Sequence, residues 1–153
     1  MDLDTRRLTS ADWPQLWPFL LEMGTTGDEI DVRDRFAALI ADPRWLLLGA
    51  ASPASTLLGY AAAQDHGPHL RHGDLHRTAR LHDLFVSRDA RRQGVGRALM
   101  STVAEWAAER VRYLEWQAHE TRSAPFYERL GHRGEACPQP DYPTFEIDFH
   151  DIA

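Results

Sequence analysis

The first group of residues in this chain with a recognisable chemical potential surrounds two glycines. In LFVSRDARRQGVGRALM, residues 84–100, an apolar run typical of a strand leads through paired arginines to Gly94 and Gly96, and a helical pattern follows. The first backbone amides of a helix lack partners within it, and the helix dipole places partial positive charge there. Glycine lets an anion approach the backbone closely, and arginine adds formal charge. The stretch therefore predicts an anion site of the kind that holds phosphate groups.

Two known phosphate-binding patterns fit this stretch poorly. A dinucleotide fingerprint, G-x-G-x-x-G, needs a third glycine where this chain has Leu99. A P-loop needs a lysine, and all 17 basic residues of the chain are arginine. A nucleotide-binding protein that uses Gly94 and Gly96 stays open as an alternative, and it predicts thermal stabilisation by a dinucleotide.

Two motifs together carry a resemblance to a known family. Arg91-x-x-Gly94-x-Gly96 resembles the pyrophosphate-binding motif of the GNAT superfamily of N-acetyltransferases, and residues 114–131, LEWQAHETRSAPFYERLG, resemble its strand and helix ending in F-Y-x-x-x-G. The resemblance implies acetyl-coenzyme A as the donor, bound where two parallel strands of the sheet splay apart. The residues that it implies for coenzyme binding are Leu84, Phe85, Val86, Arg91, Arg92, Gln93, Gly94, Val95, Gly96 and Arg97.

Transfer of an acetyl group from a thioester to an amine needs a neutral amine, a polarised carbonyl and a proton for the leaving thiolate. The resemblance places Tyr127, the tyrosine of F-Y-x-x-x-G, near the coenzyme sulfur as general acid, and the amide of Val86 near the carbonyl. His82 and Asp83 are the candidate bases, because LHDLFV is similar to the L-E-D-x-F/Y-V strand of polyamine and diamine acetyltransferases, with His82 in place of glutamate. Histidine titrates near neutrality. Packing roles for Tyr127 and His82 stay open at this point.

Acidic residues would suit a cationic acceptor. Asp28 and Glu29, within GDEIDVRD at residues 27–34, are candidates, and so is Glu120, which replaces an asparagine that is frequent in the superfamily. A solvated helix start is the alternative explanation for the first two. Histidines between residues 65 and 82 could ligate a metal, but glycine and proline interrupt that segment, so we expect no metal.

The bulk composition fits one domain over residues 1–153. A net charge of −6 argues against nucleic acid as a partner and suits a cationic small molecule. No apolar run approaches the roughly 20 residues that span a bilayer, and the first residues lack the apolar core of a signal peptide, so we expect a cytoplasmic protein without a membrane partner. Cys137 is the only cysteine, which fits a reducing compartment and argues against a covalent acetyl-enzyme.

The elements that must position these groups follow from hydrophobic periodicity and turn residues. We expect strands at 4–8, 44–51, 56–64, 80–86, 112–119 and 144–149, and helices at 9–24, 28–43, 94–110 and 123–131. Residues 52–55 predict a hairpin turn and residues 65–79 a loop. The order predicts an α/β fold, a mixed sheet flanked by helices, and it agrees with the acyltransferase fold that the resemblance implies.

The sequence thus predicts an acetyl-coenzyme A-dependent N-acetyltransferase that acts on a primary amine by direct attack in a ternary complex. A small cationic amine is the favoured acceptor. Transfer to protein amino groups and a non-catalytic, regulatory acyl-coenzyme A binding module are the alternatives. A homodimer is expected because many members of the superfamily pair through their last strands or first helices, although the apolar residues of DYPTFEIDF, 141–149, would serve a sheet core equally well.

Overall fold

The computed structural model describes residues 2–118, 120–136, 138, 139 and 141–150. The chain forms two compact units, Met1–Trp116 and Gln117–Ala153. Cys137, on which two of the expectations rest, lies outside the described residues. The elements in chain order are β1 (Asp4–Arg7), η1 (Ser10–Asp12), α1 (Trp13–Glu22), α2 (Glu29–Ala41), β2 (Trp45–Ala51), β3 (Leu57–Asp65), β4 (Thr78–Val86), η2 (Arg88–Ala90), α3 (Val95–Ala108), β5 (Tyr113–Glu115) and α4 (Ala124–Arg129).

The first unit is built on a mixed five-stranded sheet in the order β1-β2-β3-β4-β5. The pairs β1–β2, β2–β3 and β3–β4 are antiparallel, and β4–β5 is parallel. The predicted hairpin between β2 and β3 is confirmed, with Ser52 donating its amide to Thr56 across the turn at 2.9 Å. The parallel pair needs a crossover, which α3 supplies. The predicted fold class, a mixed sheet with flanking helices, is therefore confirmed.

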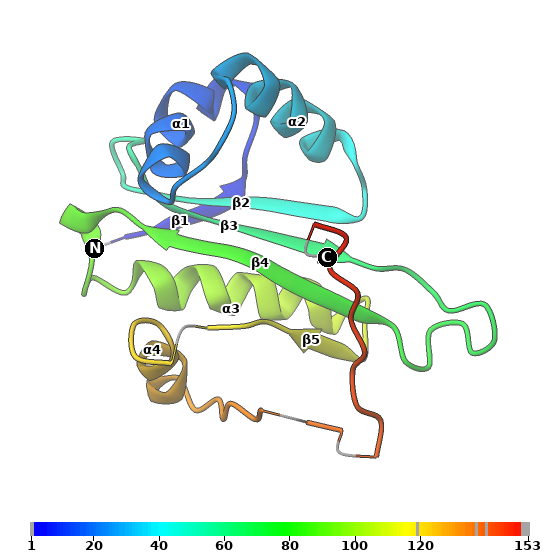
Figure 1. The fold of residues 1–153 in the computed structure, drawn as a ribbon. Helices are drawn as coiled ribbons and strands as arrows, with labels where there is room; N and C mark the ends of the chain where they lie inside the picture. The colour runs from blue at the N-terminus through cyan, green and yellow to red at the C-terminus, as the bar shows by residue number, and fades with distance from the viewer. Residues whose placement is uncertain (1, 119, 137, 140, 151–153) are drawn as a thin grey trace. The chain divides into compact units, whose positions relative to one another are not determined.

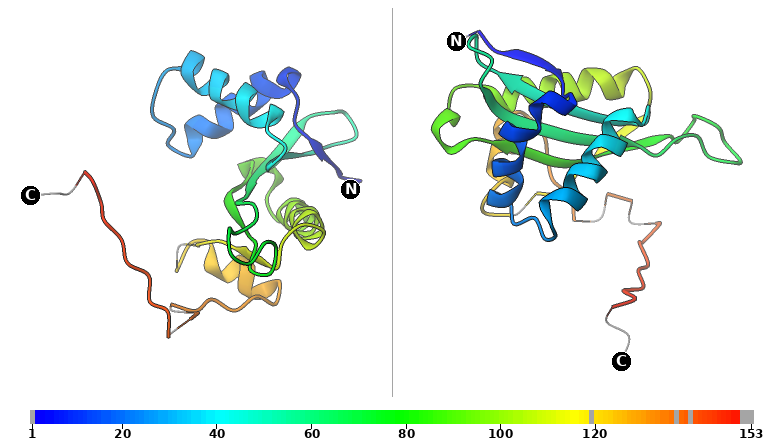
Figure 2. Two further views of the ribbon diagram at one scale, coloured as in Figure 1. Left: turned by 90° about the vertical axis from the view of Figure 1, so that its right-hand side faces the viewer. Right: turned by 90° about the horizontal axis from the view of Figure 1, so that it is seen from above.

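Helices cover both faces of this sheet (Figure 1). In the view from above, α1 and α2 lie over the strands, and α3 lies on the opposite side (Figure 2). Below α1 and α2 lies the main apolar cluster, which we call the α1/α2 cluster. Its buried members are Leu8, Trp13, Leu16, Val32, Phe36, Leu47, Leu57, Tyr60, Ala62 and Phe85.

The other face of the sheet packs against α3, whose buried side chains recur at helical spacing. Val95, Leu99 and Val103 are almost fully buried. Gly59 of β3 permits this close packing, because a Cβ there would lie 2.5 Å from the Phe85 carbonyl oxygen and 3.2 Å from a methyl of Val95. The start of α3 is therefore held directly against the middle of the sheet. No helix among the described residues is both long and apolar enough to cross a bilayer.

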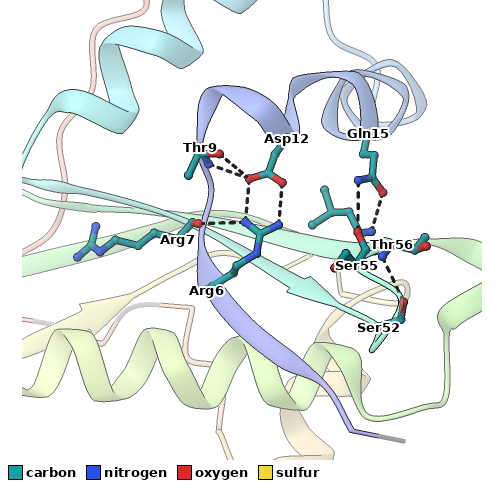
Figure 3. Close-up of polar contacts among 9 residues, drawn as sticks. Arg6, Arg7, Thr9, Asp12, Gln15, Ser52, Ser55 and Thr56 are labelled. Carbon is teal, nitrogen blue, oxygen red and sulfur yellow. Dashed lines mark hydrogen bonds and ion pairs between the residues drawn. The ribbon is translucent and has the colours of Figure 1, made fainter.

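A polar cluster fixes the entry into α1 (Figure 3). The buried Asp12 carboxylate accepts two hydrogen bonds from the Arg6 guanidinium, both at 2.8 Å, and one from the Thr9 amide at 2.8 Å. Gln15, one turn along, accepts the Leu57 amide at 2.7 Å and so ties α1 to the start of β3. The cluster joins β1, α1 and the β2–β3 hairpin by charge-assisted and neutral hydrogen bonds.

Three sequence-based boundaries need correction. β5 pairs with β4 only through Tyr113–Glu115, so the predicted strand 112–119 is shorter than expected. β3 runs to Asp65 and β4 starts at Thr78, which shortens the predicted loop 65–79 at both ends. These differences arise because a strand extends only as far as its neighbouring strand pairs with it. Hydrophobic alternation in the sequence does not specify where this pairing stops.

The predicted last strand, residues 144–149, is wrong. None of the described residues in this segment is in a strand. Its alternating Phe145, Ile147 and Phe149 are 91%, 70% and 79% exposed. Alternation predicts a strand only where a ladder partner and a covering layer exist to bury the apolar side. The second unit instead has α4 as its regular element among the described residues; Gly131, which has φ +95°, follows its C-cap, Leu130.

Candidate active site

A bulge in β4 puts two adjacent polar residues on one face of the sheet. The β3–β4 register pairs Ala62 with Asp83 and Ala63 with Leu81, so His82 is an extra, unpaired residue. Such a bulge interrupts strict alternation and redirects a side chain. Asp83 lies opposite Ala62, a member of the α1/α2 cluster, and paired residues share a face. The bulge leaves His82 on this face as well, as its contacts show.

The Asp83 carboxylate is held by a buried tyrosine. The Tyr60 hydroxyl lies 3.0 Å from Asp83 Oδ2 and 3.1 Å from the sulfur of Met23, the residue that ends α1. Tyr60 is only 2% exposed. Burial raises the pKa of the Tyr60 hydroxyl, and the negative charge of Asp83 raises it further, so the phenol stays protonated and donates. Sequence reasoning missed Tyr60, because an aromatic residue in an apolar strand is ordinarily a packing residue.

His82 is held by two other side chains of the sheet. Its ring stacks on Trp45, with centroids 5.1 Å apart, and its Nε2 lies 3.0 Å from Gln64 Oε1. Trp45 packs against the α1/α2 cluster, which places His82 on the same face as Asp83. An amide oxygen only accepts, so Nε2 donates and the neutral ring keeps its lone pair on Nδ1. Burial lowers the pKa of His82, and the charge of Arg80 lowers it further, so the imidazole is neutral at pH 7.

The turn between β4 and α3 has the conformation that an anion site requires. The Ser87 amide bonds the Leu58 carbonyl at 2.7 Å and fixes the end of β4. Arg92 and Gly94 then have φ of +65° and +81°. Left-handed positions of this kind turn successive amides toward one side and form concave anion sites. Gly94 caps α3 without a side-chain bond, and a Cβ there would meet no atom within 4 Å.

The arginines of this turn are available to an anion. Arg91, Arg92 and Arg97 are exposed. Within the part of the chain that the structure describes, no carboxylate lies at ion-pair distance from any of the three. Arg88, in contrast, contacts Glu22 at 3.5 Å. The turn therefore combines unpartnered amides with uncompensated positive charge.

Beside this turn, the outer edge of β4 is open. β5 pairs with Thr78–Arg80, and from Leu81 to Val86 no strand pairs with that edge among the described residues. Leu84 and Val86 are half-buried. Phe85 points into the α1/α2 cluster, where its ring centroid lies 5.0 Å from that of Phe19. Pairing on this edge of β4 thus ends before the residues at which the resemblance implies a coenzyme arm.

Of the other residues that the resemblance implies for coenzyme binding, one is exposed and two are buried. Gln93 is exposed, and its side-chain amide donates to the Asp89 carbonyl at 3.2 Å. Val95 and Gly96, the first residues of α3, are buried. Val95 therefore anchors the helix start in the sheet rather than facing a ligand with its side chain.

The other candidate residues are described within their own units. Asp28 caps α2 without a side-chain bond, and Glu29 accepts the Trp13 indole N–H at 3.2 Å, which gives Glu29 a structural contact. Tyr127 and Glu120 belong to the second unit. Tyr127 is half-buried beside Phe126, with ring centroids 5.0 Å apart, and burial raises the pKa of its hydroxyl. A phenol with a raised pKa keeps its proton through the neutral range.

The histidine-containing connection between β3 and β4 is organised by an ion pair. Buried Asp65 receives Arg77 through two hydrogen bonds, at 2.9 and 2.6 Å, and the Gly67 amide at 2.8 Å. Burial opposes the charge, but these donors outweigh it and lower the pKa of Asp65. Among the described residues, no group of three or more histidine, cysteine or acidic side chains could hold a metal ion.

The structure thus combines a mixed sheet, an unpaired stretch of β4 and a glycine-capped, arginine-rich helix start, as the predicted N-acetyltransferase class requires. Sequence comparison supports this class, because a profile described as the Acetyltransferase (GNAT) family matches residues 6–132. The match covers most of the chain and includes both motifs. The chain belongs to this family. No curated protein matches the chain.

Solved structures share the fold at low sequence identity. Ribosomal-protein-alanine N-acetyltransferase from Brucella melitensis biovar Abortus 2308 matches with 22% identity and a TM-score of 0.72, over 97% of this chain and 100% of that chain. Glucosamine-6-phosphate N-acetyltransferase from Arabidopsis thaliana matches with 13% identity and a TM-score of 0.75, over 97% and 99%. AAC(6')-Iy, in complex with the bisubstrate analog CoA-S-monomethyl-acetylneamine, matches with 14% identity and a TM-score of 0.76, over 97% and 99%.

Proposed function

We propose that the protein transfers the acetyl group of acetyl-coenzyme A to the primary amine of a small cationic acceptor, by direct attack in a ternary complex. The observation that carries the proposal is the β4 bulge. It sets a neutral imidazole and a carboxylate side by side, on the strand that leads directly to the arginine-rich turn. A base and a cation anchor thus share the strand that leads to the anion site.

The donor side is supported by the fit of the turn to a diphosphate. Coenzyme A supplies a diphosphate and a thioester, and the turn offers amides at the start of α3 together with Arg91, Arg92 and Arg97. Gly94 leaves room for close approach, since a Cβ there would point into open space. The open edge of β4 at Leu84–Val86 offers backbone groups to the amides of the pantetheine arm.

We assign the base and the anchor to different residues. His82 is neutral at pH 7 with an available lone pair on Nδ1, so it can accept a proton from the acceptor ammonium directly or through water. Asp83 already accepts a hydrogen bond from Tyr60, and a carboxylate bonded in this way is better suited to pairing with a cation. Of the two bases that the sequence left open, the proposal therefore takes His82.

Tyr127 is the proposed general acid for the leaving thiolate. Its support is the F-Y-x-x-x-G motif, which falls within the matched family profile, and its half-buried, protonated hydroxyl. Protonation of a thiolate by a placed acid typically contributes 10²–10⁴-fold to rate.

The charge of the α1–α2 connection supports a cationic acceptor. This connection and the adjoining helix ends, residues 22–31, have four acidic residues, Glu22, Asp28, Glu29 and Asp31, and no basic one; of these, Glu22 contacts Arg88. This connection starts at Met23, whose sulfur contacts Tyr60 beside Asp83. An acceptor that carries a phosphate would meet repulsion here, while an additional ammonium would be attracted.

The experiment that tests the proposal measures thiol release from acetyl-coenzyme A against diamines, polyamines, aminoglycosides, neutral monoamines and peptides with free amino termini. We expect turnover with cationic small amines. Transfer to peptides alone would instead assign a protein acetyltransferase. Coenzyme binding by calorimetry without transfer to any amine would assign a regulatory module, and stabilisation by a dinucleotide but not by coenzyme A would assign a nucleotide-binding protein.

Three further expectations stay predictions. The family assignment is compatible with one functional domain over residues 1–153, a homodimer and a cytoplasmic location. Sedimentation equilibrium of the purified chain tests the dimer, and limited proteolysis in the presence of coenzyme tests the single domain.

A further inference from the structure

The Tyr60 hydroxyl is a polar atom inside an otherwise apolar cluster. Its ring packs with Phe85 at a centroid distance of 6.3 Å, and the residue is 2% exposed. A hydroxyl buried at such a position costs free energy unless it is hydrogen-bonded, whereas phenylalanine would fill the same space without that cost. The hydroxyl therefore needs an explanation beyond packing.

The hydroxyl has one hydrogen and two acceptors within reach. Asp83 Oδ2 lies at 3.0 Å and Met23 Sδ at 3.1 Å. A thioether sulfur is a weak acceptor, and hydrogen bonds to an ionised carboxylate are roughly twice as strong as neutral ones. The hydrogen therefore goes to Asp83, and the sulfur of Met23, the residue after α1, contacts the same hydroxyl.

This bond fixes the orientation of the carboxylate. Asp83 is half-buried, and Oδ2 is occupied by Tyr60. His82, the neighbour of Asp83 on β4, interacts with it electrostatically and is itself engaged by Gln64 and Trp45. Oδ1 is then the oxygen that a cationic ligand can approach.

We infer that Tyr60 is the positioning residue that holds Asp83 as the seat for a second ammonium group of the acceptor. The inference rests on the proposed function and narrows its substrate class to amines that carry a further positive charge. One ammonium pairs with Asp83, while the amine to be acetylated loses its proton to His82. Tyr60 itself touches neither the acceptor nor the coenzyme.

The test compares two amines of equal length that differ in one charge, 1,4-diaminobutane and butylamine. Dissociation constants are measured by calorimetry in the presence of coenzyme A, and kcat and KM by thiol release from acetyl-coenzyme A. In the wild type we expect tighter binding of the diamine. Tyr60→Phe should weaken the diamine about tenfold, as loss of one hydrogen bond to a charged group predicts, and leave butylamine unchanged. The loss should lie in KM, with kcat little altered.

Asp83→Asn and the double variant Tyr60→Phe/Asp83→Asn complete a double-mutant cycle. Asp83→Asn should abolish the preference for the diamine, and adding Tyr60→Phe should then change nothing further. Tyr113→Phe is the matched control, because it removes a phenol hydroxyl from β5, where Tyr113 contacts Arg112 rather than Asp83. It should leave both amines unaffected. Circular dichroism confirms that each variant folds.

The outcomes separate the inference from the proposed function. If Tyr60→Phe weakens both amines alike, or still weakens the diamine in the Asp83→Asn background, Tyr60 acts through packing and the inference is wrong. It is equally overturned if the wild type shows no preference for the diamine in binding. If the wild type binds the diamine through Asp83 and Tyr60 but never acetylates it, the inference stands and the proposed function fails.

Discussion

His82 is the side chain whose protonation state matters most for the proposed chemistry. Partial burial lowers the pKa of His82 below the ordinary 6.5, so the ring loses its proton at lower pH than an unperturbed histidine would. Only the neutral ring can act as a base. We therefore expect the acidic limb of kcat/KM to have its midpoint below 6.5, and His82→Gln to lower kcat by about 10²–10⁴-fold and remove that limb. A limb that persists in the variant would assign the base to another group.

The proposed role of Tyr127 as general acid can be tested by removing its hydroxyl. Burial raises the pKa of Tyr127, so the hydroxyl stays protonated across the pH range of the assay and can donate to a thiolate. Tyr127→Phe should lower kcat by about 10²–10⁴-fold and leave the calorimetric affinity for coenzyme A nearly unchanged. Tyr142→Phe, at an exposed position in the same unit, is the control. Equal turnover in wild type and Tyr127→Phe would remove Tyr127 from the mechanism.

Among the helices, the start of α3 depends on one glycine. Gly94 has φ +81°, and a side chain there would meet open space, so alanine is disfavoured by backbone conformation alone. Alanine in the left-handed conformation is about 1–2 kcal/mol less stable than in the right-handed one. The backbone of the turn can relieve this strain by changing its φ and ψ angles, which would displace the amides that we propose bind the diphosphate. We expect Gly94→Ala to weaken coenzyme A binding about tenfold in calorimetry.

Gly73→Ala is the control for this change. Gly73 also has a left-handed φ, +58°, and open space around its Cβ, but it lies in the β3–β4 connection. This variant should lose a comparable amount of stability and keep its affinity for the coenzyme. A similar loss of affinity in both variants would show that the effect comes from general destabilisation.

Gly59 tests how the sheet holds the start of α3. A Cβ at Gly59 would lie 2.5 Å from the backbone oxygen of Phe85 and 3.3 Å from Leu99. The contact with the Phe85 oxygen is with backbone, so it can be relieved only by moving the strands apart. Gly59→Ala should therefore lower the free energy of unfolding by about 1–3 kcal/mol and weaken coenzyme A binding as well. Gly134→Ala, whose Cβ would meet nothing within 4 Å, should stay within about 0.5 kcal/mol of wild type in urea unfolding.

How far the strands and the site could be predicted depends on what each pattern encodes. The hairpin at residues 52–55 and the strand–turn–helix at residues 80–110 have local signals, namely turn residues and a change of period. The last strand was predicted wrongly because Phe145, Ile147 and Phe149 alternate without a partner in the described structure.

Some contacts of the site could not be predicted from any local sequence pattern. Regular alternation would put His82 and Asp83 on opposite faces, and only the register with β3 shows that a bulge brings them together. Tyr60 is 23 residues from Asp83 in the sequence, so their contact comes from strand pairing alone. The strand, turn and helix around Gly94, in contrast, could be predicted from local signals, and anion binding there stays a prediction.

For the chain as a whole, acid stability depends on buried ion pairs such as Asp12 with Arg6. The Arg6 hydrogen bonds lower the pKa of Asp12 below 3.8, against the opposing effect of burial. A carboxylate with a depressed native pKa stabilises the fold above its unfolded pKa, and this contribution is lost as pH falls through the native pKa. At pH 7, Asp12→Asn should lower the free energy of unfolding by about 1–3 kcal/mol.

The pH dependence checks this assignment. The difference between wild type and Asp12→Asn in urea unfolding should shrink as pH falls below 3.8, because the wild-type carboxyl then becomes neutral as well. Asp2→Asn, at an exposed position, should match wild type at every pH. A difference that stays constant down to about pH 2 would show that charge contributes nothing and that only the shape of the side chain matters.

The open edge of β4 beyond Arg80 has a consequence for handling the protein. A strand edge without a partner is a template on which another chain can add, and native proteins ordinarily cover or charge such edges. Here a bound ligand would be the cover. Protein without coenzyme A should consequently self-associate sooner on storage than protein saturated with it. The rate of self-association would then depend on how much of the protein has the ligand bound.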